Sequence, residues 1–195
     1  MIKPNDLQLE LDLGNVPEEL QPEKNIFPGT GIPVVINGET RNIEIFYWGL
    51  IPSWAKDISI GQKLINAKAE TLLEKVSFKN SFRRRRCLIP ATSFYEWNNS
   101  EGKKIPYAFS LKDQKAFMFA GLWEYWMDSS GNEVYSTTII TTAPNELVGK
   151  IHDRMPVIFN KNNCWKWMED REMKDLQNML VPYPENEMKM EESNI

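Results

Sequence analysis

Four strand-forming segments joined by short turns dominate the second half of the chain. Residues 93–97, 107–111, 116–123 and 134–142 are rich in aromatic and β-branched side chains, which favour strands. The segments between them carry the asparagine, aspartate, serine and glycine residues that are typical of turns. We therefore predict that these strands follow one another as an antiparallel meander, whose edges must be curled or closed.

Two further strands and a few helices complete the predicted fold. Residues 33–36 and 43–48 flank Asn37 and Gly38, a dipeptide that favours a hairpin turn. Helical patterns are limited to residues 69–78, 145–151 and 162–180. With 195 residues the chain is long enough for one hydrophobic core. We predict an α+β fold: a single domain dominated by a curled, barrel-like antiparallel β-sheet with a few flanking helices.

The composition excludes several classes of protein. No segment approaches the roughly 20 apolar residues that span a bilayer, and the first residues lack the apolar core of a signal peptide. Cys87 and Cys164 lie far apart, with no Cys-x-x-Cys pair or cysteine–histidine cluster, which argues against a zinc site and suits a reducing cytoplasm. We therefore expect a cytoplasmic protein that uses no membrane, metal ion or other cofactor.

Charge is unevenly distributed along the chain. Residues 25–168 hold 18 basic and 13 acidic residues, whereas the flanking segments are acidic and bring the net charge to −4. Four consecutive arginines fit either a solvated face or contacts with phosphate groups; they are Arg83, Arg84, Arg85 and Arg86. Residues 184–195 are acidic and poor in apolar side chains, so we predict a domain of residues 1–183 followed by a mobile tail.

Six short segments occur in the order found in one protein family. They are residues 25–30 (NIFPGT), 48–56 (WGLIPSWAK), 66–71 (NAKAET), 87–97 (CLIPATSFYEW), 120–124 (AGLWE) and 151–156 (IHDRMP). Over roughly residues 25–183 the chain resembles the SRAP family, the SOS-response-associated peptidases or abasic-site processing proteins. The resemblance implies a single β-rich domain with a curled antiparallel sheet and a positively charged channel. The implied partner is single-stranded DNA containing abasic sites, and we expect a monomer.

The resemblance also implies a covalent reaction in the DNA damage (SOS) response. Family members carry cysteine after the initiator methionine, and its α-amine and thiol condense with the aldehyde of an abasic site into a thiazolidine crosslink. The peptidase name reflects a proposed role of the same cysteine in removing N-terminal residues. Here position 2 is Ile2 and no cysteine precedes Cys87. Either a true start upstream supplies the cysteine, or this is a diverged member that binds without the thiol chemistry. The segment before Asn25 also looks short for the family, and no counterpart of its final strand is recognisable after Pro182.

Three residues fall on the active-site positions of the family: Asn66, Glu96 and His152. A partly buried carboxyl at Glu96 suits the proton transfers of amine–aldehyde condensation. An amide at Asn66 can hold an amine or a sugar hydroxyl without bringing charge. His152, the only histidine of the chain, could donate to an oxygen of the DNA or assist β-elimination. The alternatives remain an outward Glu96 on an alternating strand and a merely packed His152.

Further residues match DNA-contacting positions of the family. Arg154 suits a phosphate contact, with a salt bridge to Asp153 or Glu70 as the alternative. Lys68 stands where the family commonly has arginine, so it keeps the charge but loses bidentate contacts. Trp54 and Pro28 match positions that stack on or wedge between bases, with core packing as the alternative for Trp54.

These observations leave three functions open. The first is an abasic-site processing protein that binds single-stranded DNA and crosslinks to the lesion. The second is a non-catalytic module that binds single-stranded nucleic acid. The third is a lyase in which the Met1 amine or a lysine forms a Schiff base. A peptidase is the least favoured function, because no nucleophile stands beside His152 in the sequence.

Overall fold

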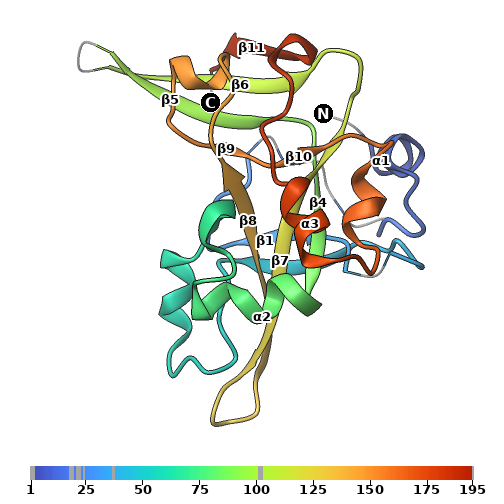
Figure 1. Cartoon of the computed structure of the whole chain (residues 1–195), viewed down its shortest axis with the longest axis vertical. Coiled ribbons are helices and arrows are strands. Elements are labelled where there is room, and N and C mark those ends of the chain that lie inside the picture. Colours follow the sequence, from blue (N-terminus) through green and yellow to red (C-terminus); the bar gives the residue numbers. More distant parts are fainter. Residues whose placement is uncertain are drawn as a thin grey trace.

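A curled sheet built around β7 and β8 forms the centre of the molecule (Figure 1). We describe a computed structural model that covers residues 3–17, 20, 23, 25–36, 38–100 and 103–194. The strands of this described part are β1 (Gly31–Val34), β2 (Glu44–Trp48), β3 (Asn66–Lys68), β4 (Arg86–Ala91), β5 (Phe94–Ser100), β6 (Lys103–Leu111), β7 (Phe117–Met127), β8 (Glu133–Thr142), β9 (Met155–Pro156), β10 (Ile158–Phe159) and β11 (Met188–Glu192). The fold is therefore the predicted single α+β domain with a curled sheet and few helices.

The central sheet has the strand order β1-β2-β8-β7-β10, and β3, β4 and β9 pair with its two long middle strands. β8 carries the run of threonine and isoleucine residues, and its residues 136–142 are all buried. β1 and β2 pair antiparallel, as predicted, although the connection between them spans residues 35–43 and is longer than a two-residue turn. β2 and β3 lie parallel to β8, which gives a mixed sheet.

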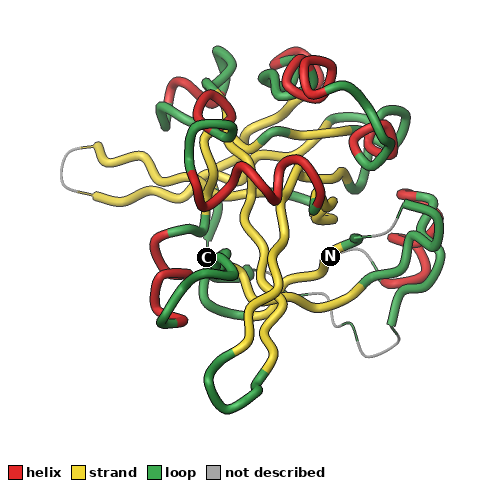
Figure 2. The backbone as a smooth tube through the Cα atoms, turned by 60° about the horizontal axis from the view of Figure 1, so that its bottom comes forward, coloured by secondary structure: helices red, strands yellow, loops and turns green. Residues whose placement is uncertain are grey.

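The predicted four-strand meander is wrong in its middle pairing, because its second and third strands, β6 and β7, do not pair with each other. β5 and β6 form one hairpin, which belongs to a second sheet of order β11-β6-β5, and β7 and β8 form another hairpin in the central sheet. β7 pairs with β4 rather than with β6. The reason is that β4 is apolar and buried at residues 87–90, so it supplies β7 with a core strand. The β5–β6 hairpin projects from the body of the molecule (Figures 1 and 2).

The helices differ from the predicted ranges: residues 69–78 hold a short 3-10 turn and only the start of a helix, residues 145–151 hold only a 3-10 turn, and α1 is not predicted at all. In the described residues they are α1 (Pro4–Leu11), α2 (Val76–Arg84) and α3 (Met173–Asn178), with 3-10 turns η1 (Ile58–Lys63), η2 (Ala69–Thr71), η3 (Val148–Lys150), η4 (Cys164–Trp167) and η5 (Glu185–Glu187). The predicted helix over 162–180 breaks between η4 and α3. Arg86 donates to the carbonyl oxygens of Trp167 at 2.9 Å and Glu169 at 2.8 Å, which a continuous helix would need for its own hydrogen bonds.

Residues 184–195, predicted as a tail without a strand, contain β11. This strand pairs antiparallel with β6, from Met188 opposite Leu111 to Glu192 opposite Tyr107. Met188 is buried, whereas Lys189 and Glu191 are exposed. The acidic composition hides this alternation, because two methionines suffice to anchor an edge strand whose other face is solvated.

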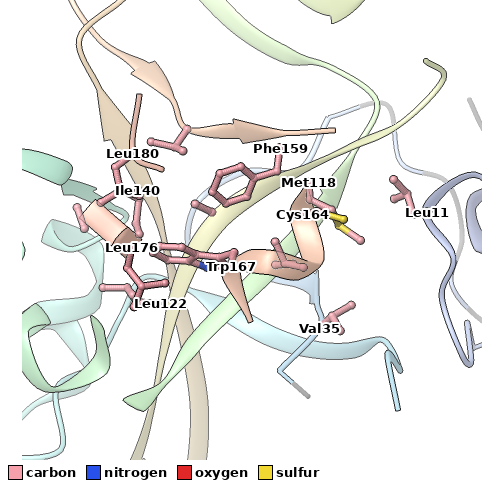
Figure 3. Close-up of a cluster of buried hydrophobic side chains, with 14 of the residues drawn as sticks. Leu11, Val35, Met118, Leu122, Ile140, Phe159, Cys164, Trp167, Leu176 and Leu180 are labelled. Atoms are coloured by element: carbon pink, nitrogen blue, oxygen red, sulfur yellow. The ribbon is translucent and has the colours of Figure 1, made fainter. Parts of the chain in front are cut away.

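Two hydrophobic clusters hold the sheets and helices together. One contains the buried side chains of α1, α2, α3 and η4 against the central sheet, and Trp167 lies within it beside Phe159 and Cys164 (Figure 3). The other fills the space toward the second sheet and includes Phe94 and Phe109, whose rings stack at 5.0 Å between centroids. The cleft described next opens at the border of this second cluster.

Candidate active site

A cleft of about 1170 Å³ collects most of the residues that the sequence singles out. Its walls come from the segment around residues 25–33, from β3, from the β4–β5 region and from residues 152–156. The predicted site residues that line it are Pro28, Asn66, Lys68, Glu96, His152 and Arg154. Segments far apart in the sequence therefore meet at one concave surface, as a binding site requires.

Asn66 and Lys68 reach the cleft from β3. This short strand lies parallel to β8, with Asn66 opposite Ile139 and Lys68 opposite Thr141. Side chains alternate along a strand, so Asn66 and Lys68 point to one face and are exposed, whereas Ala67 points to the other and is buried. An amide and an ammonium group thus stand next to each other on the cleft wall.

Glu96 lies on β5 opposite Tyr107, and its side chain is 22% exposed. Burial raises the pKa of the Glu96 carboxyl; the nearby His152 opposes this effect and Asp153 adds to it. A carboxyl with a raised pKa keeps its proton at a higher pH than an exposed glutamic acid does. Glu96 is therefore suited to donate a proton to a leaving group and to take one back.

His152 stands across from Glu96, with 4.0 Å between its Nδ1 and the Glu96 Oε1. The turn η3 positions it, because the His152 backbone N–H donates to the carbonyl of Val148 at 3.0 Å. Nδ1 lies 3.1 Å from both the N–H and the carbonyl oxygen of Arg154. A neutral ring can accept from that N–H and a protonated ring can donate to that oxygen, so the backbone accommodates both forms.

Arg154 is fixed by two partners on the side of the cleft. Its guanidinium donates to both carboxylate oxygens of Glu70 at 2.9 Å and to the carbonyl of Thr141 at 2.7 Å. The hydrogen bond from Arg154 is also the main reason that the pKa of Glu70 is lowered. Of the two salt bridges considered from the sequence, the structure has the one to Glu70. Glu70 is the partner that the sequence analysis considers, and it lies within the NAKAET segment, whereas Thr141 is not predicted as a contact of Arg154.

Trp54 and the four arginines lie outside the residues that line the cleft. Trp54 is 55% exposed, so core packing does not account for it. Arg83 and Arg84 are exposed at the end of α2. Arg86 is held by the main-chain contacts that end η4. The structure therefore does not bring these residues together with Glu96 and His152.

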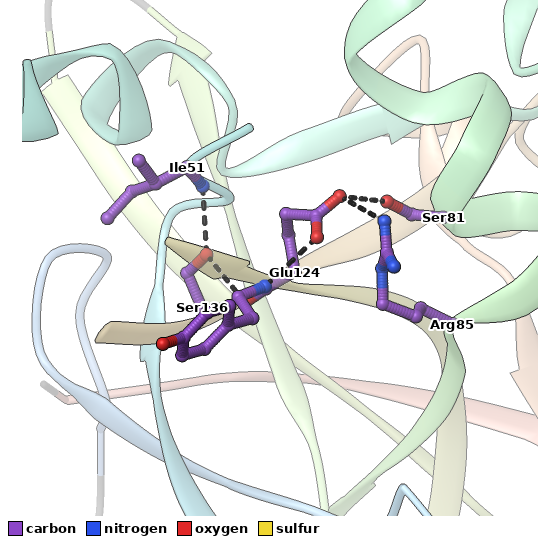
Figure 4. A network of polar contacts seen from close by, with 6 residues as sticks. Ile51, Ser81, Arg85, Glu124 and Ser136 are labelled. Carbon is purple, nitrogen blue, oxygen red and sulfur yellow. Dashed lines mark hydrogen bonds and ion pairs between the residues drawn. The ribbon is translucent and has the colours of Figure 1, made fainter. Parts of the chain in front are cut away.

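Arg85 belongs to a buried polar network on the other side of β7 (Figure 4). Its Nη2 donates to Oε2 of Glu124 at 2.7 Å, and the Ser81 hydroxyl donates to the same oxygen at 3.1 Å. The other carboxylate oxygen accepts from the Tyr125 N–H at 3.0 Å. These contacts give both carboxylate oxygens of the buried Glu124 a hydrogen-bond partner. Because Glu124 is in β7, they also join the end of α2 to the sheet.

Neither cysteine is placed as a nucleophile. Cys87 and Cys164 are both buried, and burial raises the pKa of Cys87 to about 12 and that of Cys164 to about 11. A buried thiol with a raised pKa holds almost no thiolate near neutral pH. The thiols therefore contribute to packing.

We predict that iodoacetamide modifies neither cysteine in the native protein and both after denaturation. The reason is that alkylation needs an accessible thiolate. Mass spectrometry of the intact protein counts the added groups before and after unfolding in guanidinium chloride. Rapid modification of either cysteine under native conditions would contradict the packing around it.

Within the described part of the chain, no group of three or more histidine, cysteine, aspartate or glutamate side chains is placed to hold a metal ion. In the same residues no helix has the length and apolar character required to cross a bilayer.

Comparison with known proteins identifies the family of the chain. The model of the family described as SOS response associated peptidase (SRAP) matches residues 1–194. The chain is 47% identical over 174 residues to abasic site processing protein YoqW of Bacillus subtilis (strain 168), covering 87% of this chain and 78% of that protein. It is 43% identical over 185 residues to YoaM of the same organism, an abasic site processing protein, with coverages of 93% and 82%.

The fold is also similar to a crystal structure of a protein from Bacteroides thetaiotaomicron, with a TM-score of 0.81 and 30% identity over 85% of this chain and 75% of that one. The family match spans the segments that carry the sequence resemblance and the residues that line the cleft. The chain belongs to the SOS response associated peptidase (SRAP) family.

Proposed function

We propose that this protein processes abasic sites in single-stranded DNA, with the lesion bound in the cleft. The observation that carries the proposal is the meeting of Asn66, Glu96 and His152 at one concave surface. The names of the relatives YoqW and YoaM, both abasic site processing proteins, support the same function. A role in the DNA damage (SOS) response, a monomeric state and a cytoplasmic location belong to this proposal.

Single-stranded DNA suits the charge and the aromatic side chains along the cleft. Lys68 and Arg154 supply positive charge for phosphate groups. Phe27 and Trp97 line the cleft with 58% and 39% of their surface exposed, and exposed aromatic rings stack on unpaired bases at about 1–3 kcal/mol per base. We propose that Pro28 lies next to a base in the same path, and that Trp54, Arg83 and Arg84 contact the strand beyond the cleft. Arg85 and Arg86 are held by internal contacts, but both keep part of their surface exposed. We propose that their charges attract the phosphate groups of the strand without contacting them.

The chemistry follows from the ring-opened sugar of an abasic site, which carries an aldehyde at C1′. An amine attacks this carbon and gives a carbinolamine. Glu96 then protonates the hydroxyl, which leaves as water, and an imine remains. We propose that His152 accepts the proton that leaves C2′ if the 3′ phosphate is eliminated. Asn66 orients the sugar or the amine by hydrogen bonding.

A thiazolidine crosslink needs a thiol next to the attacking amine. The sequence has Ile2, no cysteine ahead of Cys87, and two buried thiols. We propose that an amine engages the aldehyde as an imine, and that a thiazolidine forms where a cysteine thiol stands beside that amine. The burial of both cysteines supports a second candidate, a module that binds single-stranded DNA without reacting.

Trapping with borohydride separates these functions. The protein is incubated with a single-stranded oligonucleotide carrying one abasic site, with or without sodium borohydride, and with an intact oligonucleotide as the control. We expect a band that is shifted in a denaturing gel only after reduction, because borohydride turns the imine into a stable amine. Salt-sensitive binding without any trapped product would identify the non-catalytic module. No trapping and no binding to either oligonucleotide would contradict the proposed function.

A further inference from the structure

We propose that Glu70 is a positioning residue, which acts through Arg154 to hold His152 in place within the site. This inference rests on the proposed function and deepens it. Glu70 lies outside the residues that line the cleft, and its side chain is about half exposed. An effect of Glu70 on the reaction therefore passes through the residues that it contacts.

The contact between Glu70 and Arg154 joins two walls of the cleft. Glu70 lies in η2, which directly follows the strand of Asn66 and Lys68. Arg154 lies in the segment that carries His152. Two hydrogen bonds of 2.9 Å connect the guanidinium to both carboxylate oxygens, and such a bidentate pair fixes the orientation as well as the distance. Glu70 thus ties the segment of His152 to the wall that carries Asn66.

The guanidinium of Arg154 depends on this carboxylate for its place. Its side chain is only 20% exposed, and its Nε is buried with no hydrogen-bond partner among the described residues. Of its three hydrogen bonds in the described part of the chain, Glu70 accepts two and the Thr141 carbonyl accepts one. A partly buried cation that loses its carboxylate moves toward water, because burying an unpaired charge is costly. The hydrogen bond from Arg154 also lowers the pKa of Glu70, so the carboxylate is charged near neutral pH.

The main chain of Arg154 passes this constraint to His152. The Nδ1 atom of His152 lies 3.1 Å from both the N–H and the carbonyl oxygen of Arg154, so a shift of residue 154 moves the ring. The same Nδ1 stands 4.0 Å from Oε1 of Glu96, and this separation sets how strongly the two groups act on each other. Loss of the Glu70 carboxylate is therefore expected to displace the imidazole from Glu96.

The substitution Glu70→Gln tests this chain of contacts. Glutamine keeps the size of the side chain but removes its charge and one of its two acceptor oxygens. Glu169→Gln is the matched control, because Glu169 is also about half exposed and forms an ion pair with Arg171 outside the cleft. His152 is the only histidine, so one NMR signal reports its Cε1 proton. In the absence of DNA, this signal should shift in Glu70→Gln and keep its position in Glu169→Gln.

The rate of capture is the second readout. It is measured by borohydride trapping at a saturating concentration of an abasic oligonucleotide, so that binding does not limit the rate. We expect Glu70→Gln to capture the lesion about 10-fold to 100-fold more slowly than Glu169→Gln, because misplacing a reacting group by ~1 Å can slow a reaction about 100-fold.

The pH dependence of this rate separates a positioning role from a loss of stability. Burial raises the pKa of Glu96, the charge of His152 opposes this effect, and the charge of Asp153 adds to it. Moving His152 away therefore raises the pKa of Glu96 further. In Glu70→Gln the rate should fall at a higher pH than in Glu169→Gln, because Glu96 then keeps its proton to a higher pH. A merely destabilised protein would lose activity without this shift.

A double-mutant cycle determines whether Glu70 acts through Arg154. Arg154→Met keeps an unbranched side chain and removes its donors, so adding Glu70→Gln should slow capture no further. Additive effects, or an unmoved His152 signal in Glu70→Gln, would overturn the inference and leave the proposed function intact. Tighter binding of an intact oligonucleotide by Glu70→Gln at an unchanged rate of capture would also overturn it, since Glu70 would then act only as a counter-charge.

Failure of the proposed function gives a different result. The unsubstituted chain would then neither trap the aldehyde nor bind abasic DNA. The His152 signals of the free proteins would still test the inference, because they are recorded without DNA.

Discussion

Replacing Glu96 with glutamine is expected to slow the capture of an abasic site by about 100-fold to 10,000-fold, the range for loss of one general acid. Glutamine keeps the size of the side chain and can still form hydrogen bonds, but its amide has no acidic proton to give to the leaving hydroxyl. The rate of borohydride trapping under single-turnover conditions measures this effect. An oligonucleotide that carries a tetrahydrofuran abasic analogue has no aldehyde. Its binding should change little, since no proton moves in that complex.

The pH dependence of capture provides a second readout of the same group. Because burial raises the pKa of Glu96, its acid form persists above the range of an exposed glutamic acid and disappears as the pH rises through that raised value. The rate for the unsubstituted protein should therefore fall on the alkaline side where Glu96 loses its proton, and Glu96→Gln should lack that fall. Glu74→Gln, at an exposed position outside the cleft, is the matched control. Equal rates for Glu96→Gln and the control would contradict the role of Glu96.

Replacing Trp167 with alanine should lower the free energy of unfolding by about 3–5 kcal/mol, the range for a large buried aromatic side chain. Trp167 is fully buried in the cluster shown in Figure 3. Its ring lies 5.8 Å from that of Phe159 and 5.9 Å from that of Phe82, and its Nε1 donates to the Cys87 carbonyl at 3.0 Å. Alanine would leave a cavity and remove the indole hydrogen bond to β4.

Urea unfolding followed by circular dichroism measures this loss. Trp54→Ala is the control, because Trp54 is 55% exposed and exposed substitutions usually change stability by less than about 0.5 kcal/mol. Trp167→Phe should fall between the two, since it keeps much of the packing and loses the hydrogen bond. Similar unfolding midpoints for Trp167→Ala and Trp54→Ala would contradict the position of Trp167 in the core.

Local patterns in the sequence predict the strands better than they predict strand pairing. The segments that become β5, β6, β7 and β8 are recognisable from their composition. Their assignment to two sheets is not, because alternation along one strand does not identify its neighbour. β11 is not predicted from the sequence for a related reason. Met188 and Met190 are its only apolar residues, and the acidic residues around them dominate the composition.

The candidate site depends on the family resemblance rather than on spacing. Asn66, Glu96 and His152 come from β3, β5 and the segment after η3, and no periodicity of the chain predicts that they meet. Charge alone likewise does not separate the roles of neighbouring arginines. Arg83 is exposed, whereas Arg85 faces Glu124, which lies 39 residues further along the chain. Such partners become visible only when the tertiary contacts are known.

The imidazole resonance of His152 gives the most direct test of the cleft as the lesion-binding site. The chain holds one histidine, so its Cε1 proton produces a single signal that reports on this cleft. We predict that a single-stranded oligonucleotide with a tetrahydrofuran abasic analogue shifts this signal until it saturates, and that an intact oligonucleotide of equal length shifts it less. An unchanged signal while fluorescence anisotropy shows the abasic oligonucleotide bound would contradict the account.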